Sequence, residues 1–388
     1  MKKNSSCLSC KLSSFEKIIL IKKFPAYFGA VPTLNDLNRI PFYPLSISRC
    51  KNCGLVQQIN LINENVMNKV YEADYYNIAS PILTGMGKTV IDEFYNFLLS
   101  SNKKKGKVLE LASSDGYLLL RLKKAGYDVY GCDPGSLSNI AAKNLGKERI
   151  KNTFFDSQTY EKESFDFIIF RNLLEHIYKP DAFLSSVHKT LKKNGKIFIE
   201  VPDIKYYEKY GGFGSFFHQH VFYFSLQTLS KLLNDNRFKI LKYQIRKEKI
   251  FVMAEIMQEK NKPQFFGGIY DTKKIVRENM NLTKKIIKIF RNKSNKKIAL
   301  FGASSVSTAI AQILNASERK KISHVFDNDV SKHGLFCVGV NKKILAPLRK
   351  YTSEFDFIIV TSYVADKIIR KQLLELKVKK DKIISLLP

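Results

Sequence analysis

The sequence predicts an α/β protein with two units built on parallel β-sheets. The first unit begins with a short apolar strand over 107–111, which ends in a turn of small residues and continues as an amphipathic helix. From there to residue 201, strand and helix patterns alternate, which is typical of a parallel sheet with helices on both faces. A second strand–turn–helix pattern starts at Lys297. We therefore expect two Rossmann-like units within the 388 residues.

The expected elements follow the chain in order. After a polar, tyrosine-rich connector from residue 62, we expect a helix over 89–99. In the first unit we expect strands over 107–111, 127–132, 165–170 and 196–201, a segment at 150–155, and helices over 116–125, 136–145 and 180–193. Beyond an irregular segment over 210–225 we expect a helix near 226–235, strands to about 257, a basic helix over 272–291, strands over 323–326 and 355–361, and a helix near 364–377. The predicted domains are 1–65, 66–262 and 263–388.

The turn over 112–116 has features of a nucleoside-binding site. Its backbone N–H groups and the start of the following helix point beyond the strand end, where ligands of such sheets bind. Asp133 ends the next strand, where a carboxylate accepts both hydroxyls of a ribose. A tight strand-to-helix joint without a ligand would use the same small residues, and Asp133 favours the nucleoside site over that reading.

Four of the six cysteines form two pairs with the spacing of metal ligands. Cys7-x-x-Cys10 and Cys50-x-x-Cys53 are separated by 39 residues, and each pair forms a tight knuckle when both thiolates bind one ion. Four thiolates close a tetrahedral zinc site, so we expect structural zinc. Cys132 and Cys337 stand alone in apolar strands and are expected to be inert core residues.

The composition is that of a globular protein with a strongly basic surface. The net charge of +30 comes from 65 Lys and Arg against 35 Asp and Glu. The lysines are dispersed over every segment, without an Arg-rich arm, so we expect no nucleic-acid partner and interpret the charge as a lysine-rich surface. Attraction of a small, phosphorylated substrate is the functional alternative. No apolar run reaches the length of a membrane span, and no apolar segment follows the basic start as in a signal peptide. We therefore expect a cytoplasmic protein without membrane insertion.

Three histidines follow strand ends or lie in a loop rich in Gly and Phe. His176 comes directly after the strand over 165–170. A helix-capping or packing role for His176 is the alternative to a catalytic one. His218 and His220 alternate within the irregular segment, and a third metal ligand is missing from the sequence around them. An apolar loop favours neutral imidazole, which suits a general base, although satisfied loop histidines remain an alternative.

Motifs along the whole chain occur in one specific order, from cysteine pairs through the turn and the His-x-His loop to the second Rossmann-like start. They are Phe28-Gly29, Tyr43–Gln57, Val108–Leu119, Gly131-Cys-Asp-Pro134, Asn172-Leu-Leu-Glu-His-Ile177, His218-Gln-His-Val-Phe-Tyr-Phe-Ser225, Phe301-Gly-Ala-Ser-Ser305 and Val325-Phe-Asp-Asn-Asp329. In this order they resemble the zinc-containing sugar C-methyltransferases, which use S-adenosylmethionine and act on nucleotide-linked 4-keto sugars. The resemblance implies a class I (Rossmann-like) methyltransferase core between an N-terminal zinc-binding domain and a C-terminal Rossmann-like domain.

The resemblance also implies roles for individual residues. His220 is the base that removes a proton beside the C4 ketone, His176 is the donor that faces the enolate oxygen, and Gln219 occupies the position of the family's second catalytic group. The cofactor site comprises Glu110, Ala112, Ser113, Asp115, Gly116, Leu118, Asp133, Pro134, Phe155, Asn172 and Leu173. The acceptor site comprises Tyr75, Tyr76, Phe217, His218, Gly302, Ser304 and Ser305, with zinc on Cys7, Cys10, Cys50 and Cys53.

The chain departs from the family pattern at two positions in the loop. The family has Tyr and Glu where this chain has Phe217 and Gln219, so a hydroxyl and a carboxylate are lost. Without that carboxylate, His220 lacks the partner expected to raise its basicity. Ala112 in place of Gly matters less, because a small residue still lets the backbone approach the cofactor.

We therefore expect an enzyme, a monomer or dimer, that transfers a methyl group from S-adenosylmethionine to a nucleotide-activated sugar, at the carbon next to a C4 ketone. The first alternative is an O- or N-methyltransferase of surface-polysaccharide biosynthesis, since a lone His220 suffices to deprotonate a hydroxyl. Alternatives of a different class are a non-catalytic homologue that binds a nucleotide sugar, or an RNA-binding protein.

Overall fold

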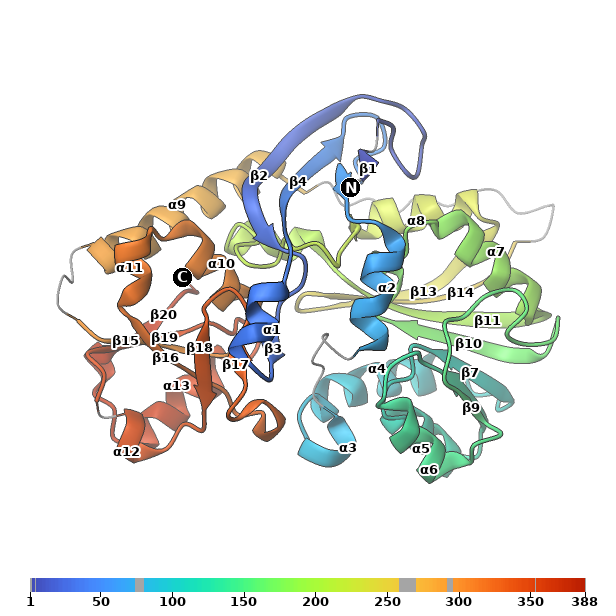
Figure 1. The fold of residues 1–388 in the computed structure, drawn as a ribbon. Coiled ribbons are helices and arrows are strands. Elements are labelled where there is room, and N and C mark those ends of the chain that lie inside the picture. The colour runs from blue at the N-terminus through green and yellow to red at the C-terminus, as the bar shows by residue number, and fades with distance from the viewer. Residues whose placement is uncertain are drawn as a thin grey trace.

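The computed structural model describes residues 2–3, 5–73, 80–257, 270–291, 296–352 and 354–387. These residues form three units, each with its own β-sheet (Figure 1). The N-terminal unit lies at the top of this view, the central unit at the right and the C-terminal unit at the left. The prediction of two parallel α/β units is confirmed.

The central unit has a seven-stranded sheet, in which five strands are parallel and a hairpin is added at one edge. In spatial order the strands are β13 (Phe238–Arg246), β14 (Lys249–Ile256), β11 (Leu191–Pro202), β10 (Phe165–Arg171), β7 (Lys107–Leu111), β8 (Asp128–Cys132) and β9 (Ile150–Lys151). β14 runs antiparallel to β11 and β13 antiparallel to β14. The helices are α4 (Lys88–Ser101), α5 (Tyr117–Lys124), α6 (Ser138–Leu145), α7 (Pro180–Thr190) and α8 (Leu226–Asp235).

Two expected boundaries in this unit were wrong. The helix expected to reach residue 193 ends at Thr190, because Leu191 is buried and already pairs with Phe165 as the first residue of β11. The segment expected over 150–155 contributes only the two residues of β9, and its remainder is irregular.

The N-terminal unit is a small antiparallel sheet whose outermost strand comes from elsewhere in the chain. Its strands, in spatial order, are β12 (Phe222–Tyr223), β5 (Val56–Gln58), β4 (Phe42–Cys50) and β2 (Phe15–Pro25). Further elements are β1 (Lys2–Lys3), β6 (Asn60–Leu61), α1 (Leu34–Arg39), α2 (Glu64–Glu72) and α3 (Pro81–Thr84). Because β12 lies in the chain between β11 and α8 of the central unit, directly after His218 and His220, this pairing attaches the His-x-His loop to the N-terminal unit.

The C-terminal unit likewise borrows a strand. Its strands, in spatial order, are β20 (Ile383–Ser385), β19 (Phe357–Val360), β15 (Ile298–Phe301), β16 (Ile322–Phe326), β18 (Lys342–Leu345), β17 (Phe336–Cys337) and β3 (Ala30–Val31). Its helices are α9 (Thr272–Arg291), α10 (Ser305–Ile313), α11 (Ala316–Lys320), α12 (Arg349–Thr352) and α13 (Asp366–Glu375), with short 3-10 turns η3 (Val330–Lys332) and η4 (Lys380–Lys382). Two further 3-10 turns, η1 (Leu174–His176) and η2 (Ile204–Lys209), follow β10 and β11 of the central unit. In the described part of the chain, no helix combines the length and apolar character needed to cross a membrane.

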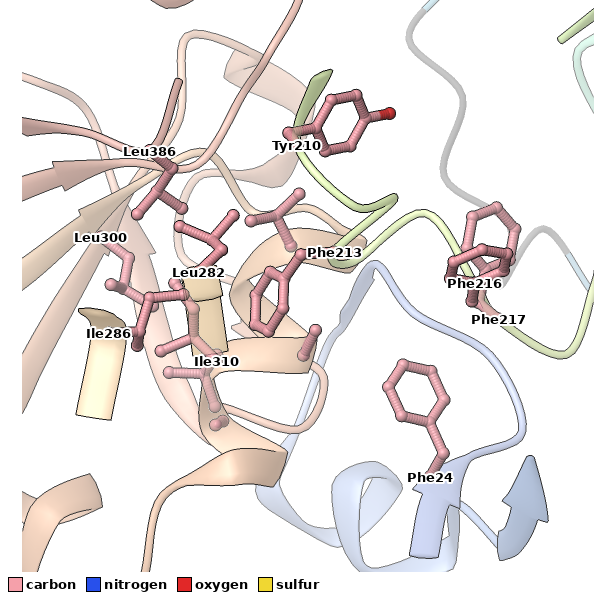
Figure 2. Close-up of a cluster of buried hydrophobic side chains, with 14 of the residues drawn as sticks. Phe24, Tyr210, Phe213, Phe216, Phe217, Leu282, Ile286, Leu300, Ile310 and Leu386 are labelled. Carbon is pink, nitrogen blue, oxygen red and sulfur yellow. The ribbon is translucent and has the colours of Figure 1, made fainter. Parts of the chain in front are cut away.

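One hydrophobic cluster joins all three units through the loop over 210–217 (Figure 2). Phe213 reaches Leu282 and Ile310 of the C-terminal unit, while Phe217 lies toward Phe24 of the N-terminal unit. Burial of such large side chains stabilises the fold by roughly 1.5–3 kcal/mol each. The loop that carries the histidines is therefore anchored on both sides.

Glycines let this loop approach its neighbours closely. A Cβ atom on Gly211 would lie 1.9 Å from the backbone nitrogen of Asn279 on α9, and one on Gly214 would lie 2.6 Å from the Cα of Val306 on α10. Both glycines also have positive φ, at 70° and 74°. Only glycine satisfies both conditions at once.

Candidate active site

The turn between β7 and α5 has the strained backbone of a ligand-binding turn. Ala112 and Ser114 have φ of 55° and 48°, a left-handed conformation that is uncommon for residues other than glycine. Gly116 has φ of 78°, and a Cβ atom there would lie 2.9 Å from the Cβ of Ala141. The turn is thus held close to α6.

Asp133 connects this turn to the end of β8. Its Oδ2 accepts a hydrogen bond from the Ser114 backbone N–H at 2.9 Å, and its Oδ1 accepts one from Gly135 at 2.8 Å. Asp133 and Pro134 are half-buried. The carboxylate expected to hold a ribose therefore also fixes the shape of the turn after β7, through Ser114, and of the turn after β8, through Gly135.

Polar atoms around the turn lack partners among the described residues. They are Oε2 of Glu110 and the hydroxyl oxygens of Ser113 and Ser114, all buried. Burial raises the pKa of Glu110 to about 8, although Arg171 opposes the shift. Because buried polar groups are normally hydrogen-bonded, these atoms fit a ligand that brings hydroxyl and amino groups, as S-adenosylmethionine does.

Asp115, another predicted cofactor residue, is bonded to the protein on both carboxylate oxygens. Its carboxylate accepts hydrogen bonds from the Ser80 hydroxyl at 2.6 Å, the Ile82 N–H at 2.7 Å and the Tyr117 N–H at 3.0 Å. It thereby joins α3 to the start of α5 and is only 1% exposed. Leu118 is also buried, in the core beside α6. Both residues shape the turn from behind.

The remaining cofactor candidates follow other strands. Asn172 and Leu173 come after β10, which lies beside β7 in the sheet, and Asn172 has φ of 46°. The side chain of Asn172 accepts from Lys249 and its amide nitrogen lies 3.4 Å from Glu200. Phe155 packs edge-on against Phe183, with ring centroids 6.0 Å apart.

A buried charge network underlies this edge of the sheet. Arg171 donates to Glu200 at 2.7 Å, and Lys249 lies 3.5 Å from the same carboxylate. Burial opposes ionisation of Glu200, but the two cations outweigh it and lower its pKa. Removing either partner would leave a buried charge uncompensated, so the network rigidifies the strand ends.

His176 and His220 meet beyond the end of β10. His176 belongs to η1, and its ring centroid lies 4.8 Å from that of His220, with the rings at 81°. Burial lowers the pKa of His176 to about 4 and that of His220 well below its usual value. Both imidazoles are therefore neutral at pH 7, the state in which a ring nitrogen accepts a proton.

Tyr71 completes this pair and was missed from the sequence. Its hydroxyl lies 3.1 Å from Nδ1 of His176, and the two rings are 6.0 Å apart at 89°. Tyr71 lies on α2, which the sequence pattern did not reveal. Tyr75 and Tyr76, the expected acceptor-binding tyrosines, lie outside the described residues.

Glu175 lies in the same cluster. One side-chain oxygen or nitrogen from each of Glu175, His176 and His220 falls within 4.8 Å of the others, and all three residues are buried. Burial raises the pKa of Glu175 to about 8, against the opposing effect of Lys249. The sequence places Glu175 directly before His176 but predicted no role for it, and the structure brings its carboxyl to His220 as well.

The other loop residues face different surroundings. The ring of Phe217 packs on His220 at 4.2 Å and on Phe28 at 4.8 Å. His218 points away from the pair, between Phe24 and Tyr43, with its Nε2 3.4 Å from the Tyr43 carbonyl oxygen.

Gln219 lies between His218 and His220 in the sequence, and its side chain is buried. Neither polar atom of its side chain has a hydrogen-bond partner in the described structure.

Gln58 holds the histidine loop from the N-terminal unit. Its amide nitrogen lies 3.1, 2.7 and 2.5 Å from the carbonyl oxygens of Phe217, His218 and His220. The residue is fully buried and sits on β5, which pairs with β12. The sequence analysis missed Gln58, because nothing in the sequence distinguishes it from an ordinary polar residue.

The four paired cysteines converge as expected for a metal site. Their Sγ atoms lie within 4.8 Å of one another, with 3.6 Å between Cys7 and Cys53 and 3.5 Å between Cys10 and Cys50. A tetrahedral zinc ion with Zn–S bonds of 2.3 Å places sulfur atoms about 3.8 Å apart, so the set fits zinc.

The second pair leads directly into β5. The backbone N–H of Gly54 donates to the Cys50 carbonyl at 3.0 Å, as in a tight knuckle, and φ of Gly54 is 79°. Two residues separate this glycine from Gln57, whose side chain accepts from the Leu8 N–H at 2.9 Å. The cluster is thus linked through β5 to the histidine loop.

The turn after β15 repeats the plan of the first turn. Asp327 accepts from the Ala303 N–H at 2.8 Å, as Asp133 does from Ser114, and Gly302 has φ of 119°. Ser304 donates to the carbonyl of Thr361 at 2.9 Å, and Ser305 begins α10. These residues belong to the C-terminal unit and are not part of the histidine cluster (Figure 1).

Two open hollows, of about 400 and 550 Å³, lie away from all these residues. They are formed mainly by β2 and the start of α9, with Glu16 among basic side chains such as Lys17, Lys273 and Arg277. None of the predicted cofactor, acceptor, catalytic or metal residues lines either hollow.

Comparison with known proteins identifies the central unit. Residues 86–243 match the family described as "Methyltransferase domain". The central unit is a methyltransferase domain. The strand order and this match confirm the predicted class I Rossmann-like methyltransferase fold, whose members depend on S-adenosylmethionine. Residues 294–384 match a family described as "C2185-like, N-terminal".

Individual relatives are distant from this chain. The C-methyltransferase NovU of Streptomyces niveus is 23% identical over 239 residues, or 61% of this chain and 56% of that protein. Phosphoethanolamine N-methyltransferase 2 of Caenorhabditis elegans is 28% identical over 120 residues, or 29% of this chain and 28% of that protein. The chain therefore spans about half of one curated relative and a quarter of the other.

A solved structure gives a looser match. The 1,6-didemethyltoxoflavin-N1-methyltransferase of Burkholderia thailandensis, with bound S-adenosylhomocysteine, is 15% identical, with a TM-score of 0.41. The alignment covers 55% of this chain and 96% of that one.

Proposed function

We propose that the protein transfers a methyl group from S-adenosylmethionine to the carbon next to a C4 ketone in a nucleotide-linked sugar. The observation that carries the proposal is the meeting of two neutral, buried imidazoles, His176 and His220, beyond the end of β10. β10 is the direct neighbour of β7, whose turn fits the cofactor. The likeness to a C-methyltransferase supports methylation at carbon.

The chain's own residues account for the proton transfers. When bound, S-adenosylmethionine supplies a methyl group on a positively charged sulfur. His220 accepts the proton from the carbon beside the ketone, and the electron pair of that C–H bond moves into an enolate. The N–H of His176, which bonds to the backbone of Gln219 in this structure, turns to the enolate oxygen and donates a hydrogen bond to it. This bond is needed because the C–H is acidic only when that oxygen is stabilised. S-adenosylmethionine held at the β7 turn would supply the methyl group to that carbon and would leave as S-adenosylhomocysteine.

The other units have supporting roles in this proposal. We assign structural zinc to Cys7, Cys10, Cys50 and Cys53, whose sulfur positions fit a tetrahedral site in a reducing compartment. We assign the nucleotide of the acceptor to the C-terminal turn at Gly302, Ser304 and Ser305, because it repeats the Asp-bound plan of the cofactor turn. The partner in this scheme is a small molecule.

The test is methyl transfer from labelled S-adenosylmethionine to a panel of nucleotide-linked 4-keto sugars and their 4-hydroxy counterparts. We expect label only with 4-keto sugars and NMR signals of a new methyl on carbon. His220→Ala should abolish transfer without changing cofactor affinity, while His188→Ala, on the outer helix α7, should not. Methyl on oxygen or nitrogen, or use of 4-hydroxy sugars, would contradict the enolate and favour the O- or N-methyltransferase alternative.

A further inference from the structure

The cluster at η1 contains buried polar atoms that have no use in the mechanism described so far. Both carboxyl oxygens of Glu175 and Nδ1 of His220 are buried and have no hydrogen-bond partner within the described structure. Their residues belong to the set whose side-chain oxygen and nitrogen atoms approach within 4.8 Å. Unpaired buried groups of this kind are rare in native proteins, which indicates that they serve one another or a ligand.

The backbone holds the two residues in this relation. The N–H of Val221 donates to the carbonyl of Glu175 at 2.8 Å, so the chain next to His220 is bonded directly to η1. Gln58 fixes the carbonyl of His220 from the other side. Because one side-chain oxygen of Glu175 and one ring nitrogen of His220 already lie within 4.8 Å of each other, the proposal asks only that the Glu175 carboxyl turn toward Nδ1 of His220.

We propose that Glu175 is the positioning partner of His220: its carboxylate accepts the Nδ1–H of that ring and so leaves Nε2 free to take the acceptor's proton. A carboxyl in this place fixes the tautomer of the imidazole and stabilises the imidazolium that forms. It supplies the negative charge that Gln219 cannot. The proposal rests on the proposed function, since it concerns the base of that reaction.

The ionisation of Glu175 gives this pair a pH dependence. The titratable and charged groups around it are His176 on η1, Tyr207 on η2, His220 in the loop, Lys249 on β14 and Glu200 on β11. Burial and Glu200 raise its pKa to about 8, while Lys249 opposes them. Below pH 8 the neutral carboxyl donates to Nδ1, which puts the ring hydrogen on Nε2 and blocks the base. Above pH 8 the carboxylate accepts from Nδ1–H, and Nε2 becomes the base.

A metal ion bound by Glu175, His176 and His220 is the alternative explanation for the unpaired atoms, and the structure favours it less. His176 already engages the hydroxyl of Tyr71 through Nδ1 and hydrogen-bonds to the backbone of Gln219. A metal bound to His220 would also remove the base. The experiment below separates the two arrangements.

The first measurement determines which ring nitrogen of His220 carries the proton, and it needs no acceptor substrate. In the full chain labelled with ¹⁵N-histidine, the six histidines give resolvable ring signals, and His220→Gln identifies those of His220. We expect its protonated nitrogen to change from Nε2 to Nδ1 as pH rises through about 8 in the native protein, and to stay the same in Glu175→Gln. An identical tautomer at all pH values in both proteins would overturn the proposal, whatever the acceptor is.

The second readout is methyl transfer to a dTDP-linked 4-keto-6-deoxy sugar. We expect kcat of the native protein to rise about tenfold from pH 7 to pH 8.5 or beyond, and kcat of Glu175→Gln at pH 9 to be about 10- to 100-fold lower with cofactor affinity unchanged. The double variant Glu175→Gln with Gln219→Glu should recover activity by restoring a carboxylate beside His220.

Glu248→Gln is the matched control. Burial also raises the pKa of this carboxyl, but it lies outside the cluster, so the pH profile should not change. A pH profile of Glu175→Gln that matches the native one would overturn the proposal. Activity that depends on added Zn²⁺, with two metal ions per chain, would overturn it in favour of a metal site. Absence of transfer by the native protein would count against the proposed function alone, because the tautomer readout still decides the role of Glu175.

Discussion

Replacing Gln58 by methionine would measure how firmly the N-terminal unit holds the histidine loop. The Gln58 amide nitrogen faces three carbonyl oxygens, but its two hydrogens make only two good hydrogen bonds at once. Two bonds contribute about 2 kcal/mol, and the buried carbonyls left without a donor add about 1 kcal/mol. The Oε1 atom of Gln58 is buried and has no partner among the described residues, so removing this atom offsets part of the loss in the free energy of unfolding. We expect a net loss of about 2 kcal/mol in the free energy of unfolding.

That loss is smaller than the stability of most domains, so the variant should fold and its activity can be measured. Urea unfolding would give the free energy, and methyl transfer at saturating cofactor would give kcat, which we expect to fall about tenfold as the loop loosens. Cofactor affinity should not change, because Gln58 does not contact the β7 turn. The control is Gln372→Met, whose amide pairs with Asn328 on the surface. A Gln58 variant with the native unfolding free energy and native kcat would refute the reasoning.

Three further predictions follow from the site. Asp133→Ala should raise the cofactor dissociation constant about 5- to 150-fold, measured by calorimetry, because charge-assisted bonds worth about 1–3 kcal/mol are lost; an unchanged constant would remove Asp133 from the site. Cys10→Ser should lower both the zinc content, measured by atomic absorption, and the melting temperature, and equal zinc content in the two proteins would exclude the four-sulfur site. Burial lowers the pKa of His218 to about 4, so its contribution to stability is present above pH 6.5 and is lost as pH falls through 4. Urea unfolding from pH 7 to pH 4 should therefore show a loss of about 3 kcal/mol more in the native protein than in His218→Gln, and parallel curves would disprove the assignment.

The helices and strands that were predicted correctly have long or strongly apolar sequence patterns that do not depend on distant residues. The helix expected over 272–291 is α9 with the same bounds, because its apolar residues recur at helical spacing over 20 residues. The strand over 107–111 is likewise β7. The turn after it was recognisable because small residues in this place permit the positive φ seen at Ala112 and Ser114.

The parts that were missed depend on distant partners. β3 and β12 are two residues each, and they are strands only because β17 and β5 offer them edges. No local pattern marks such pairings. Gln58 and Glu175 resemble ordinary polar residues in the sequence, and their place beside His220 follows from the way the loop is folded back. Tyr71 is another such case, since α2 carries it to His176 across 105 positions of sequence.

The placement of β3 has a consequence for how the protein is made. Its partner residues in β17, Phe336 and Cys337, follow Ala30 and Val31 by about 300 positions. At a synthesis rate of about 5–20 residues per second, the ribosome needs about 15–60 seconds to produce them. During that time this apolar stretch has emerged but has no sheet to join. One edge strand of the C-terminal sheet is thus synthesised long before the strand that it pairs with.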